Sequence, residues 1–440
     1  MAVPEDVRVS ERRVVSNVIK GSIGNLIEWY DWYAYTAFSV YFAATFFPKG
    51  STTAQLLNTA AVFAVGFLMR PLGGWLLGRF ADQFGRRSAL VLTVTMMAAG
   101  SLLIAVTPGY SSIGIAAPII LVLARLLQGL SVGGEYATSA TYLSEVASSG
   151  KRGFYSSFQY VTLTSGQLIA LALQIVLQQV LTKEELSSWG WRIAFAVGAV
   201  SAVVVMYLRR TMDESASYKA EVKRAAGEGA GGGSRGQLRV LAKYPKECLL
   251  VAGLTLGGTV AFYTYTTYLQ KFMQNTSGIE TSTVTVINFV ALLIFVALQP
   301  VYGRLSDRIG RRPLLLFFGI AGTLLSVPLL TLLQNTRSPI GAFLIMMAAL
   351  LIVSGYTSIN AIVKAELFPT KIRALGVGLP YALTVAIFGG TAELIALALK
   401  QAGHESVFFY YVSGCILVSL IVYVTMRETS KNSPLENDQD

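Results

Sequence analysis

Several charged side chains stand inside long apolar stretches of this chain. Glu28 and Asp31 are three residues apart, so a helix there would place both carboxylates on one face. A charge near the middle of a lipid bilayer costs at least about 2.5–3.5 kcal/mol, so each such residue is a candidate for function. Two adjacent carboxylates with little water around them bind protons more readily than solvated ones, so one of the two could bind and release a proton near neutral pH. The alternative is a fixed ion pair with an arginine of a neighbouring helix.

Two arginines are the matching cations. Arg70 and Arg125 each lie within an apolar stretch, and the planar guanidinium group pairs with a carboxylate through two parallel hydrogen bonds. Each arginine could neutralise Glu28, Asp31 or Glu135 inside the protein, or bind the carboxylate of an anionic substrate, and the two roles are compatible. Glu135 has two interpretations as well, as a proton acceptor or as an internal counter-ion.

Further polar side chains could line the same site. The other candidate substrate-binding residues are Tyr33, Gln159, Tyr265 and Lys364, and each of them could instead be a packing residue. The only histidine, His404, lies in a short turn, so a proton relay inside the membrane would have to use carboxylates. The sequence contains no metal-ligand cluster, nucleophile triad or phosphate-binding loop, so we expect neither an enzyme nor a cofactor or metal.

The elements that must position these residues follow from the composition. Of 440 residues, 53% are hydrophobic and only 13% are charged, and the mean hydropathy is +0.56. Soluble domains carry about 25% charged residues, and a helix of about 20 apolar residues spans the hydrocarbon core of a bilayer. The sequence therefore predicts an all-α polytopic membrane protein. Twelve spans are predicted, at residues 17–46, 55–79, 88–107, 114–146, 154–181, 189–210, 246–272, 282–303, 313–333, 340–368, 372–400 and 406–427.

The distribution of basic residues orients these spans. Most of the 35 Lys and Arg residues fall in the tails, in the middle segment and in alternate turns, which predicts that this side and both termini are cytoplasmic. Because topology explains the net charge of +11, we do not expect nucleic-acid binding. The basic residues expected on the opposite side are Lys49, Lys183, Arg192, Lys271, Arg337 and Lys400. The predicted parts are an N-terminal tail (1–16), a six-helix bundle (17–210), a Gly-rich linker (211–245), a second six-helix bundle (246–427) and a C-terminal tail (428–440).

One charged turn occurs twice in the chain. Residues 78–87, Gly-Arg-Phe-Ala-Asp-Gln-Phe-Gly-Arg-Arg, return at 303–312 as Gly-Arg-Leu-Ser-Asp-Arg-Ile-Gly-Arg-Arg. A second pair of similar segments begins at Glu145 and at Glu366. Two motifs repeated at nearly the same offset indicate that the chain consists of two similar halves.

The repeated turn resembles the signature of the major facilitator superfamily. Residues 25–35, 70–74 and 125–135 resemble its metabolite:proton symporter family, and residues 153–162, 364–369 and 373–378 resemble the members that carry 2-oxoglutarate. The resemblance covers essentially the whole chain and implies alternating access by two helical bundles around a central site. It implies proton-coupled import of 2-oxoglutarate or a similar dicarboxylate across a bacterial inner membrane by a monomer. Other family members carry citrate, shikimate, proline or betaine.

In such a transporter the repeated turns would hold the cytoplasmic ends of the halves together while the site faces outward. We expect Arg86 to pair with Glu145 and to orient Asp82 toward the N-terminus of the eleventh span, where an anion is favoured. The second half would mirror this arrangement with Arg311, Glu366 and Asp307. The alternative, in which the arginines only set the topology, leaves both aspartates without a role.

The membrane potential constrains the coupling. Moving one charge across the membrane is worth about 2.3 kcal/mol per 100 mV. A 2-oxoglutarate dianion that enters with one proton carries a net negative charge against an inside-negative potential, whereas entry with two protons is voltage-neutral. We therefore expect at least two protons per dianion, carried by Glu28, Asp31, Glu135 or the substrate itself.

Overall fold

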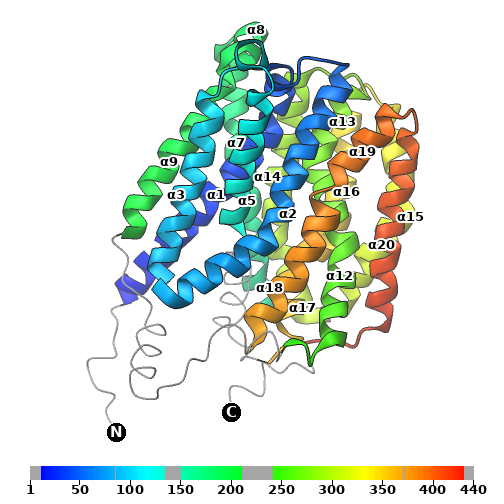
Figure 1. The fold of residues 1–440 in the computed structure, drawn as a ribbon. Helices are drawn as coiled ribbons and strands as arrows, with labels where there is room; N and C mark the ends of the chain where they lie inside the picture. Colours follow the sequence, from blue (N-terminus) through cyan, green and yellow to red (C-terminus); the bar gives the residue numbers. More distant parts are fainter. Residues whose placement is uncertain (1–10, 85, 134–149, 211–240, 370–371, 431–440) are drawn as a thin grey trace.

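The computed structural model describes residues 11–84, 86–133, 150–210, 241–369 and 372–430. Every regular element in these ranges is a helix, and the long helices stand side by side (Figure 1). The predicted all-α class is confirmed. The helices of the first half are α1 (Glu11–Phe46), α2 (Thr52–Phe84), α3 (Arg86–Val106), α4 (Tyr110–Ile113), α5 (Ala116–Val132), α7 (Arg152–Val180), α8 (Lys183–Glu185), the π-helix η2 (Leu186–Gly190) and α9 (Arg192–Arg210).

The second half repeats the pattern with more interruptions. Its helices are α12 (Pro245–Tyr263), η3 (Thr264–Tyr268), α13 (Leu269–Asn275), α14 (Thr281–Ile309), α15 (Arg312–Gln334), α16 (Pro339–Thr357), α17 (Asn360–Ala365), α18 (Arg373–Thr384), η5 (Val385–Gly389), α19 (Ala392–Gln401) and α20 (Glu405–Thr425). The π-helices η3 and η5 interrupt the seventh and eleventh predicted spans, which the sequence did not indicate. A π-turn inserts one residue and so rotates the residues after it by about 100° around the helix axis.

Nine helical segments of the described chain are long and apolar enough to cross a membrane, or ten if the bent pair Lys183–Gly190 and Arg192–Tyr207 counts as one span. α1 and the 17-residue α5 are the remaining two of the twelve predicted spans. α2 and α14 run past their predicted ends at residues 79 and 303, because the helix continues through the charged motif. Gly310 then ends α14 with φ of 95°, a conformation that residues with a Cβ rarely adopt.

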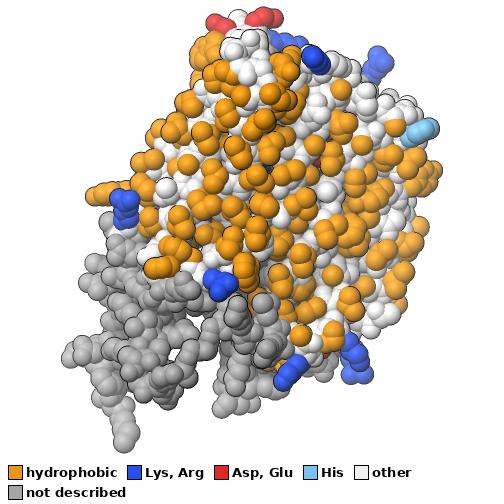
Figure 2. All heavy atoms as spheres, viewed as in Figure 1, with side chains coloured by type: hydrophobic (Ala, Val, Ile, Leu, Met, Phe, Trp, Pro, Cys, Tyr) orange, Lys and Arg blue, Asp and Glu red, His pale blue; other side chains and the backbone are white. Residues whose placement is uncertain are grey.

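The bundle has an apolar surface, whereas many polar side chains are buried in its interior. Figure 2 shows a broad hydrophobic face, with charged side chains gathered toward its two ends. Leu102, Val200 and Leu324, for example, are more than half exposed on α3, α9 and α15. Buried polar side chains are common in the described interior, including Gln128, Asn288 and Gln299. This distribution suits a protein whose outer faces contact lipid and whose centre contacts a polar solute.

The two halves touch along two pairs of helices, α7 with α14 and α2 with α19 (Figure 1). We call the end at which α14 finishes the Asp307 end, and the end that carries α8 the α8 end. At the α8 end, Gln178 donates to Thr285 (3.1 Å) and Asn275 to Thr53 (3.3 Å). Toward the Asp307 end, the amide of Asn360 donates to the hydroxyl of Tyr160 (3.1 Å). In the described part of the chain the halves therefore contact each other at both ends.

Candidate functional site

Gly129 of α5 and Gly133, which follows its last residue, allow α5 to lie directly against α2. A Cβ atom added at Gly133 would fall 2.0 Å from the carbonyl oxygen of Arg70, and one at Gly129 would fall 2.0 Å from that of Gly66. Any side chain at these positions would push the two backbones apart. The approach of α2 to α5 brings Arg70 and Arg125 to the same part of α1.

The two guanidinium groups share one aromatic ring. Cζ of Arg70 is 4.2 Å, and Cζ of Arg125 is 4.1 Å, from the centroid of Trp32. Phe67 lies 3.9 Å from Arg70, and Tyr35 lies 4.4 Å from Arg125. Such cation–π contacts are worth about 0.5–2 kcal/mol each and partly offset the repulsion between two buried cations. We call Arg70, Arg125 and Trp32 the arginine site.

Both arginines keep hydrogen-bond donors without an acceptor. Arg70 is 6% exposed and Arg125 is fully buried. Nε and Nη2 of each side chain find no acceptor in the part of the chain that the structure describes. A buried donor left unsatisfied costs about 1–3 kcal/mol, and more when it is charged. Carboxylates are the acceptors that fit the guanidinium fork, so the arginine site is suited to a small organic anion.

Asp31 is connected to this site through another side chain. Its carboxylate accepts hydrogen bonds from the hydroxyl of Ser101 on α3 and from the amide of Gln128 on α5. The amide oxygen of Gln128 in turn accepts from Nη1 of Arg125 at 2.6 Å. Gln128 therefore links Asp31 to Arg125 through hydrogen bonds. Sequence reasoning missed Gln128, although its spacing of three from Arg125 puts both on one face of α5.

The structure says less about the other two proposed proton carriers, Glu28 and Glu135. Glu28 is buried on α1, 2% exposed, one helical turn before Asp31. The side chains that donate hydrogen bonds to Asp31 come from α3 and α5. Glu135 lies outside the described residues.

The remaining predicted substrate-binding residues divide into two groups. The hydroxyl of Tyr33 lies near Arg70 and Tyr263 and so belongs to the arginine site. Lys364 is fully buried, with Nζ 3.7 Å from the ring centroid of Tyr381, which is itself an electrostatic neighbour of Tyr33.

Gln159 and Tyr265 form the second group. Gln159 is buried on α7. The hydroxyl of Tyr265 shares a hydrogen bond of 2.7 Å with Ser326 on α15, which holds this ring against another helix of its own half.

One basic residue has a partner that the sequence did not predict. Lys271 was expected on the non-cytoplasmic side, and its side chain is only 3% exposed and forms an ion pair with Glu393 of α19. The π-turn η3, three residues earlier, gives Lys271 a direction that a regular helix would not give it. The positive-inside pattern could not reveal this, because it counts charges and ignores the direction of side chains.

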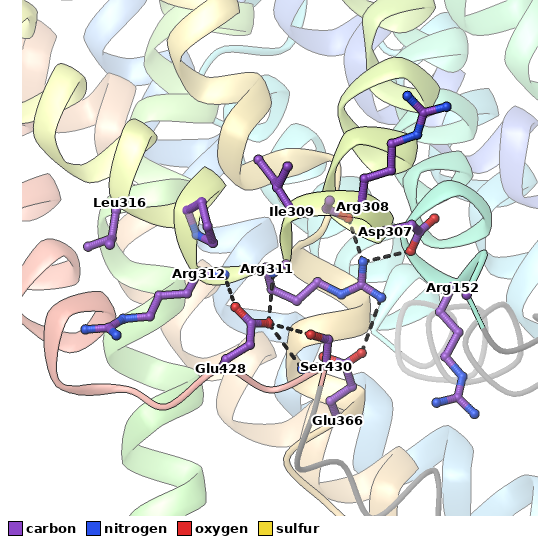
Figure 3. A pocket seen from close by; sticks show the side chains of 14 residues that line it. Arg152, Asp307, Arg308, Ile309, Arg311, Arg312, Leu316, Glu366, Glu428 and Ser430 are labelled. Atoms are coloured by element: carbon purple, nitrogen blue, oxygen red, sulfur yellow. Dashed lines mark hydrogen bonds and ion pairs between the residues drawn. The ribbon is translucent and has the colours of Figure 1, made fainter.

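A charged cluster joins the two halves at the Asp307 end. The carboxylate of Asp307 accepts hydrogen bonds from the backbone N–H groups of Gly153 (2.7 Å) and Phe154 (2.9 Å), in the first turn of α7. An anion is favoured at this position by the free N–H groups and the dipole of the helix. Arg311 donates to Asp307 at 2.8 Å and to Glu366 at 3.5 Å (Figure 3). The structure thus brings together the three residues proposed for the second gate.

Close backbone packing accompanies this cluster. A Cβ atom at Gly153 would fall 2.2 Å from Oγ of Ser306 and 2.6 Å from the carbonyl oxygen of Gly303. The halves are in backbone contact here, so even a small side chain at either glycine would separate them. The equivalent first gate cannot be compared, because Glu145 and the side chains of Asp82 and Arg86 lie outside what the structure describes.

The segment that follows α20 also binds to this cluster. The carboxylate of Glu428 accepts from the backbone N–H groups of Arg311 and Arg312, both at 2.9 Å. Burial acts to raise the pKa of Glu428, but these hydrogen bonds and those from Ser430 outweigh it and hold the pKa below its ordinary value. Burial raises the pKa of Glu366, against the opposing charge of Arg311. These groups border a cavity of about 620 Å³ (Figure 3).

Comparison with known proteins identifies the fold family. The family model described as "Sugar (and other) transporter" matches residues 18–235 and 237–439. The chain belongs to this transporter family, within the major facilitator superfamily. It is 51% identical to the alpha-ketoglutarate permease of Escherichia coli (strain K12), over 96% of both chains. It is 32% identical to the citrate-proton symporter of Klebsiella pneumoniae, over 92% of this chain and 90% of the other.

The solved structure of the proton:xylose symporter XylE, bound to 6-bromo-6-deoxy-D-glucose, has the same fold. The TM-score is 0.74 at 18% identity, and the match covers 98% of this transporter and 99% of XylE. The predicted twelve-helix major facilitator fold is confirmed. Apolar helices and permease relatives make this transporter a multi-pass protein of the bacterial inner membrane.

Proposed function

We propose that this transporter imports 2-oxoglutarate, or a similar dicarboxylate, together with protons by alternating access. The observation that carries the proposal is the pair of buried guanidinium groups with unsatisfied donors at the arginine site. A dicarboxylate supplies acceptors for both arginines, and the 51% identity to an alpha-ketoglutarate permease points to the same class of substrate. In this proposal the chain is not an enzyme and works as a monomer without a cofactor.

The proposed roles of the residues follow from their places. Arg70 and Arg125 bind substrate carboxylate, with Tyr33 beside them and Lys364 on the facing half. Asp31, through Gln128, releases or holds Arg125 according to its protonation. Glu28, Glu135, Gln159 and Tyr265 remain proposals from the sequence alone.

The proposed gate lies at the end of the protein that is proposed to face the cytoplasm. The basic Asp307 end faces the cytoplasm, as do both termini, because Lys and Arg residues gather there. Asp307, Arg311 and Glu366 close that end when the site faces outward, and Asp82, Arg86 and Glu145 are proposed to do so in the first half. The two bundles (17–210 and 246–427) move as the two bodies of the cycle, joined by the linker.

Transport by the purified protein in proteoliposomes tests the function. Labelled 2-oxoglutarate should accumulate when the outside is acid, and a protonophore should abolish the accumulation. Unlabelled succinate should compete more strongly than proline, because proline offers only one carboxylate. Accumulation of citrate, shikimate, proline or betaine without any uptake of 2-oxoglutarate would instead establish the alternative, a symporter of the same family for another metabolite.

A further inference from the structure

The buried ion pair between Lys271 and Glu393 has no part in the function as described so far. Their side chains are 3% and 5% exposed, on α13 and α19 of the same half. Each residue follows a π-helix, Lys271 after η3 and Glu393 after η5. Because π-turns in helices occur frequently at functional sites, two of them re-aiming the two partners of one ion pair require an explanation.

Stability does not supply that explanation. Taking two charges out of water costs several kcal/mol for each ion, and an apolar pair of similar size is often equally stable or more stable. The pair is also incompletely satisfied. Oε1 of Glu393 accepts from Lys271, whereas the buried atom Oε2 has no hydrogen-bond partner among the described residues. A free carboxylate oxygen in this environment is a site where a proton can bind.

The pair lies next to the arginine site, across the boundary between the halves. Glu393 is an electrostatic neighbour of Tyr35, whose ring lies 4.4 Å from the guanidinium group of Arg125. α19 also packs on α2, and just before α19 a Cβ atom at Gly390 would fall 2.4 Å from Phe67, the ring against Arg70. Aromatic rings that contact the arginines therefore also lie beside the part of the chain that carries Glu393.

We propose that a substrate carboxylate replaces Glu393 on Lys271, and that Glu393 takes up one proton in the exchange. This inference rests on the proposed function and assigns one of its protons. The proton comes from the outside water and binds to the Glu393 carboxylate. The Lys271–Glu393 ion pair breaks, and Lys271 forms an ion pair with one carboxylate of the dianion while the arginines hold the other. When the substrate leaves on the far side, Glu393 loses the proton there and pairs with Lys271 again.

Charge balance favours this exchange. Before binding, the positive Lys271 is neutralised by Glu393, and after binding it is neutralised by the substrate, while the protonated Glu393 is neutral. The local charge is the same in both states, so neither state leaves an isolated buried ion. Binding of substrate without the proton would leave two carboxylates against one ammonium group, which burial penalises.

The surroundings of Glu393 are consistent with this role. The titratable groups that face it are Lys271 from α13, Tyr268 from η3 and Tyr35 from α1. On α20, which also packs on α19, Glu405 is already bound to Lys400 (3.4 Å) and Thr276 (2.6 Å).

The other two helices packed on α19 carry groups engaged elsewhere. Arg70 of α2 and Tyr263 of α12 are neighbours of each other and of Tyr33. Lys271 is therefore the cation paired with Glu393.

The test compares Glu393→Gln with the wild type in proteoliposomes, and measures protons taken up per 2-oxoglutarate. Glutamine resembles the protonated acid, so we expect counterflow of labelled substrate within about twofold of the wild type, and a ratio lower by one proton. The wild-type affinity should fall by up to about tenfold per pH unit as the pH rises, because binding takes up one proton. The variant should lose this component of the pH dependence.

Two further variants separate coupling from folding. Glu405→Gln removes the carboxylate of a second Lys–Glu pair in the same half and should leave the proton ratio unchanged. The double substitution of Lys271 and Glu393 by Met removes both charges together; we expect a melting temperature near that of the wild type and at least a tenfold loss of substrate affinity. Wild-type affinity in this variant would overturn the proposal.

The outcomes also distinguish this inference from the function on which it rests. If the wild type transports 2-oxoglutarate and Glu393→Gln keeps the same proton ratio and the same pH dependence, the inference is wrong and the function stands. If the wild type transports no dicarboxylate, both are wrong.

Discussion

Arg70 and Arg125 place two like charges against one indole ring, although the described chain offers them too few acceptors. The folded protein would be more stable with apolar side chains at these positions, since each buried unsatisfied donor costs free energy. The arrangement is reasonable if the substrate supplies the missing acceptors, because the hydrogen bonds formed by these donors then contribute to the binding free energy. Asp31 and Gln128 also position Arg125: Gln128, held by Asp31, accepts from one guanidinium nitrogen, and the other nitrogens stay available for the ligand.

Replacing Arg125 by lysine tests this interpretation. Lysine keeps the charge but loses the planar fork and the stacking on Trp32 and Tyr35. We expect the dissociation constant for 2-oxoglutarate, measured by isothermal titration calorimetry in detergent, to rise about 10- to 100-fold, which corresponds to roughly 1.5–3 kcal/mol for a charged hydrogen bond.

Arg192 provides a matched control for that variant. It also stacks on a tryptophan, at 4.4 Å from Trp191, and it donates to the backbone oxygens of Ala105 and Thr107 near the α8 end. Arg192→Lys should bind substrate like the wild type. Equal weakening by both substitutions would mean that general destabilisation, and not the loss of a ligand contact, explains the result.

Sequence reasoning found the charged residues but not all of their partners. Arg70, Arg125, Glu28 and Asp31 stand out because a charge inside an apolar stretch is rare and needs a cause. Gln128 and Ser101 are uncharged, and their role depends on which helices are neighbours, so composition does not single them out. The pairing of Lys271 with Glu393 was not predicted, because a π-turn before each residue changed its direction in a span that reads as a regular helix.

Among the helices, the contact of α2 with α5 is the one that builds the site. It depends on Gly66, Gly129 and Gly133, where backbone meets backbone. The helices themselves were predictable from apolar length, since the bilayer fixes how long a span must be. Which helices pack against each other was not predictable, because any apolar helix can face lipid equally well.

Gly133→Ala should therefore impair the protein more than a helical glycine substitution usually does. The added Cβ would fall 2.0 Å from the carbonyl oxygen of Arg70, so α2 must move away from α5 and take Arg70 with it. We expect a fall of several degrees in the melting temperature, from an overpacking cost of about 1–3 kcal/mol, together with weaker binding.

Gly414→Ala on α20 is the control for that substitution. Nothing lies within 4 Å of a Cβ atom at Gly414, and alanine is favoured over glycine in a helix by about 1 kcal/mol. This variant should be as stable as the wild type or slightly more so. If both variants melted alike, the α2–α5 contact would not be limiting.

Glu428 caps α15 by accepting from two N–H groups in its first turn, and this predicts a pH effect. A carboxyl whose pKa is lowered in the folded protein stabilises it above the ordinary pKa of 4.5, and this stabilisation is lost as the pH falls through the lowered value. Glu428→Gln should lower the melting temperature at pH 7 through the loss of about 1 kcal/mol of capping. As the pH falls below 4.5 the difference between the two proteins should shrink, and a difference that stayed constant with falling pH would contradict the assignment.

Seen as a whole, the protein is two bundles held together at both ends. The repeated turn in the sequence anticipated the cluster at the Asp307 end, since two copies of one motif in two similar halves imply equivalent places. The contacts at both ends could not be predicted, because such contacts must break at other points of a transport cycle and the free energies of the states nearly balance.

Asp307→Asn should shift that balance. The change removes the charge that binds the N-terminus of α7 and that pairs with Arg311. We expect accumulation of 2-oxoglutarate to fall at least about tenfold, while its dissociation constant changes less than twofold, because 1–3 kcal/mol of a charged contact is lost far from the arginine site.

Arg308 is the control on the same turn, because its side chain points away from the cluster (Figure 3). Arg308→Gln should transport normally, with normal amounts of protein in the membrane. Normal accumulation by Asp307→Asn would show that the cluster is not a gate.

The indole of Trp32, between the two guanidinium groups, has a practical consequence. Two other tryptophans, Trp75 and Trp189, are more than 40% exposed and Trp191 is buried elsewhere, so Trp32 is one of the few whose environment would change when an anion draws the cations from its ring. In a protein whose other tryptophans are replaced by phenylalanine, the fluorescence intensity of Trp32 would then report whether the arginine site is occupied. Such a protein would allow the arrival and departure of the substrate to be followed in real time, without attaching any label.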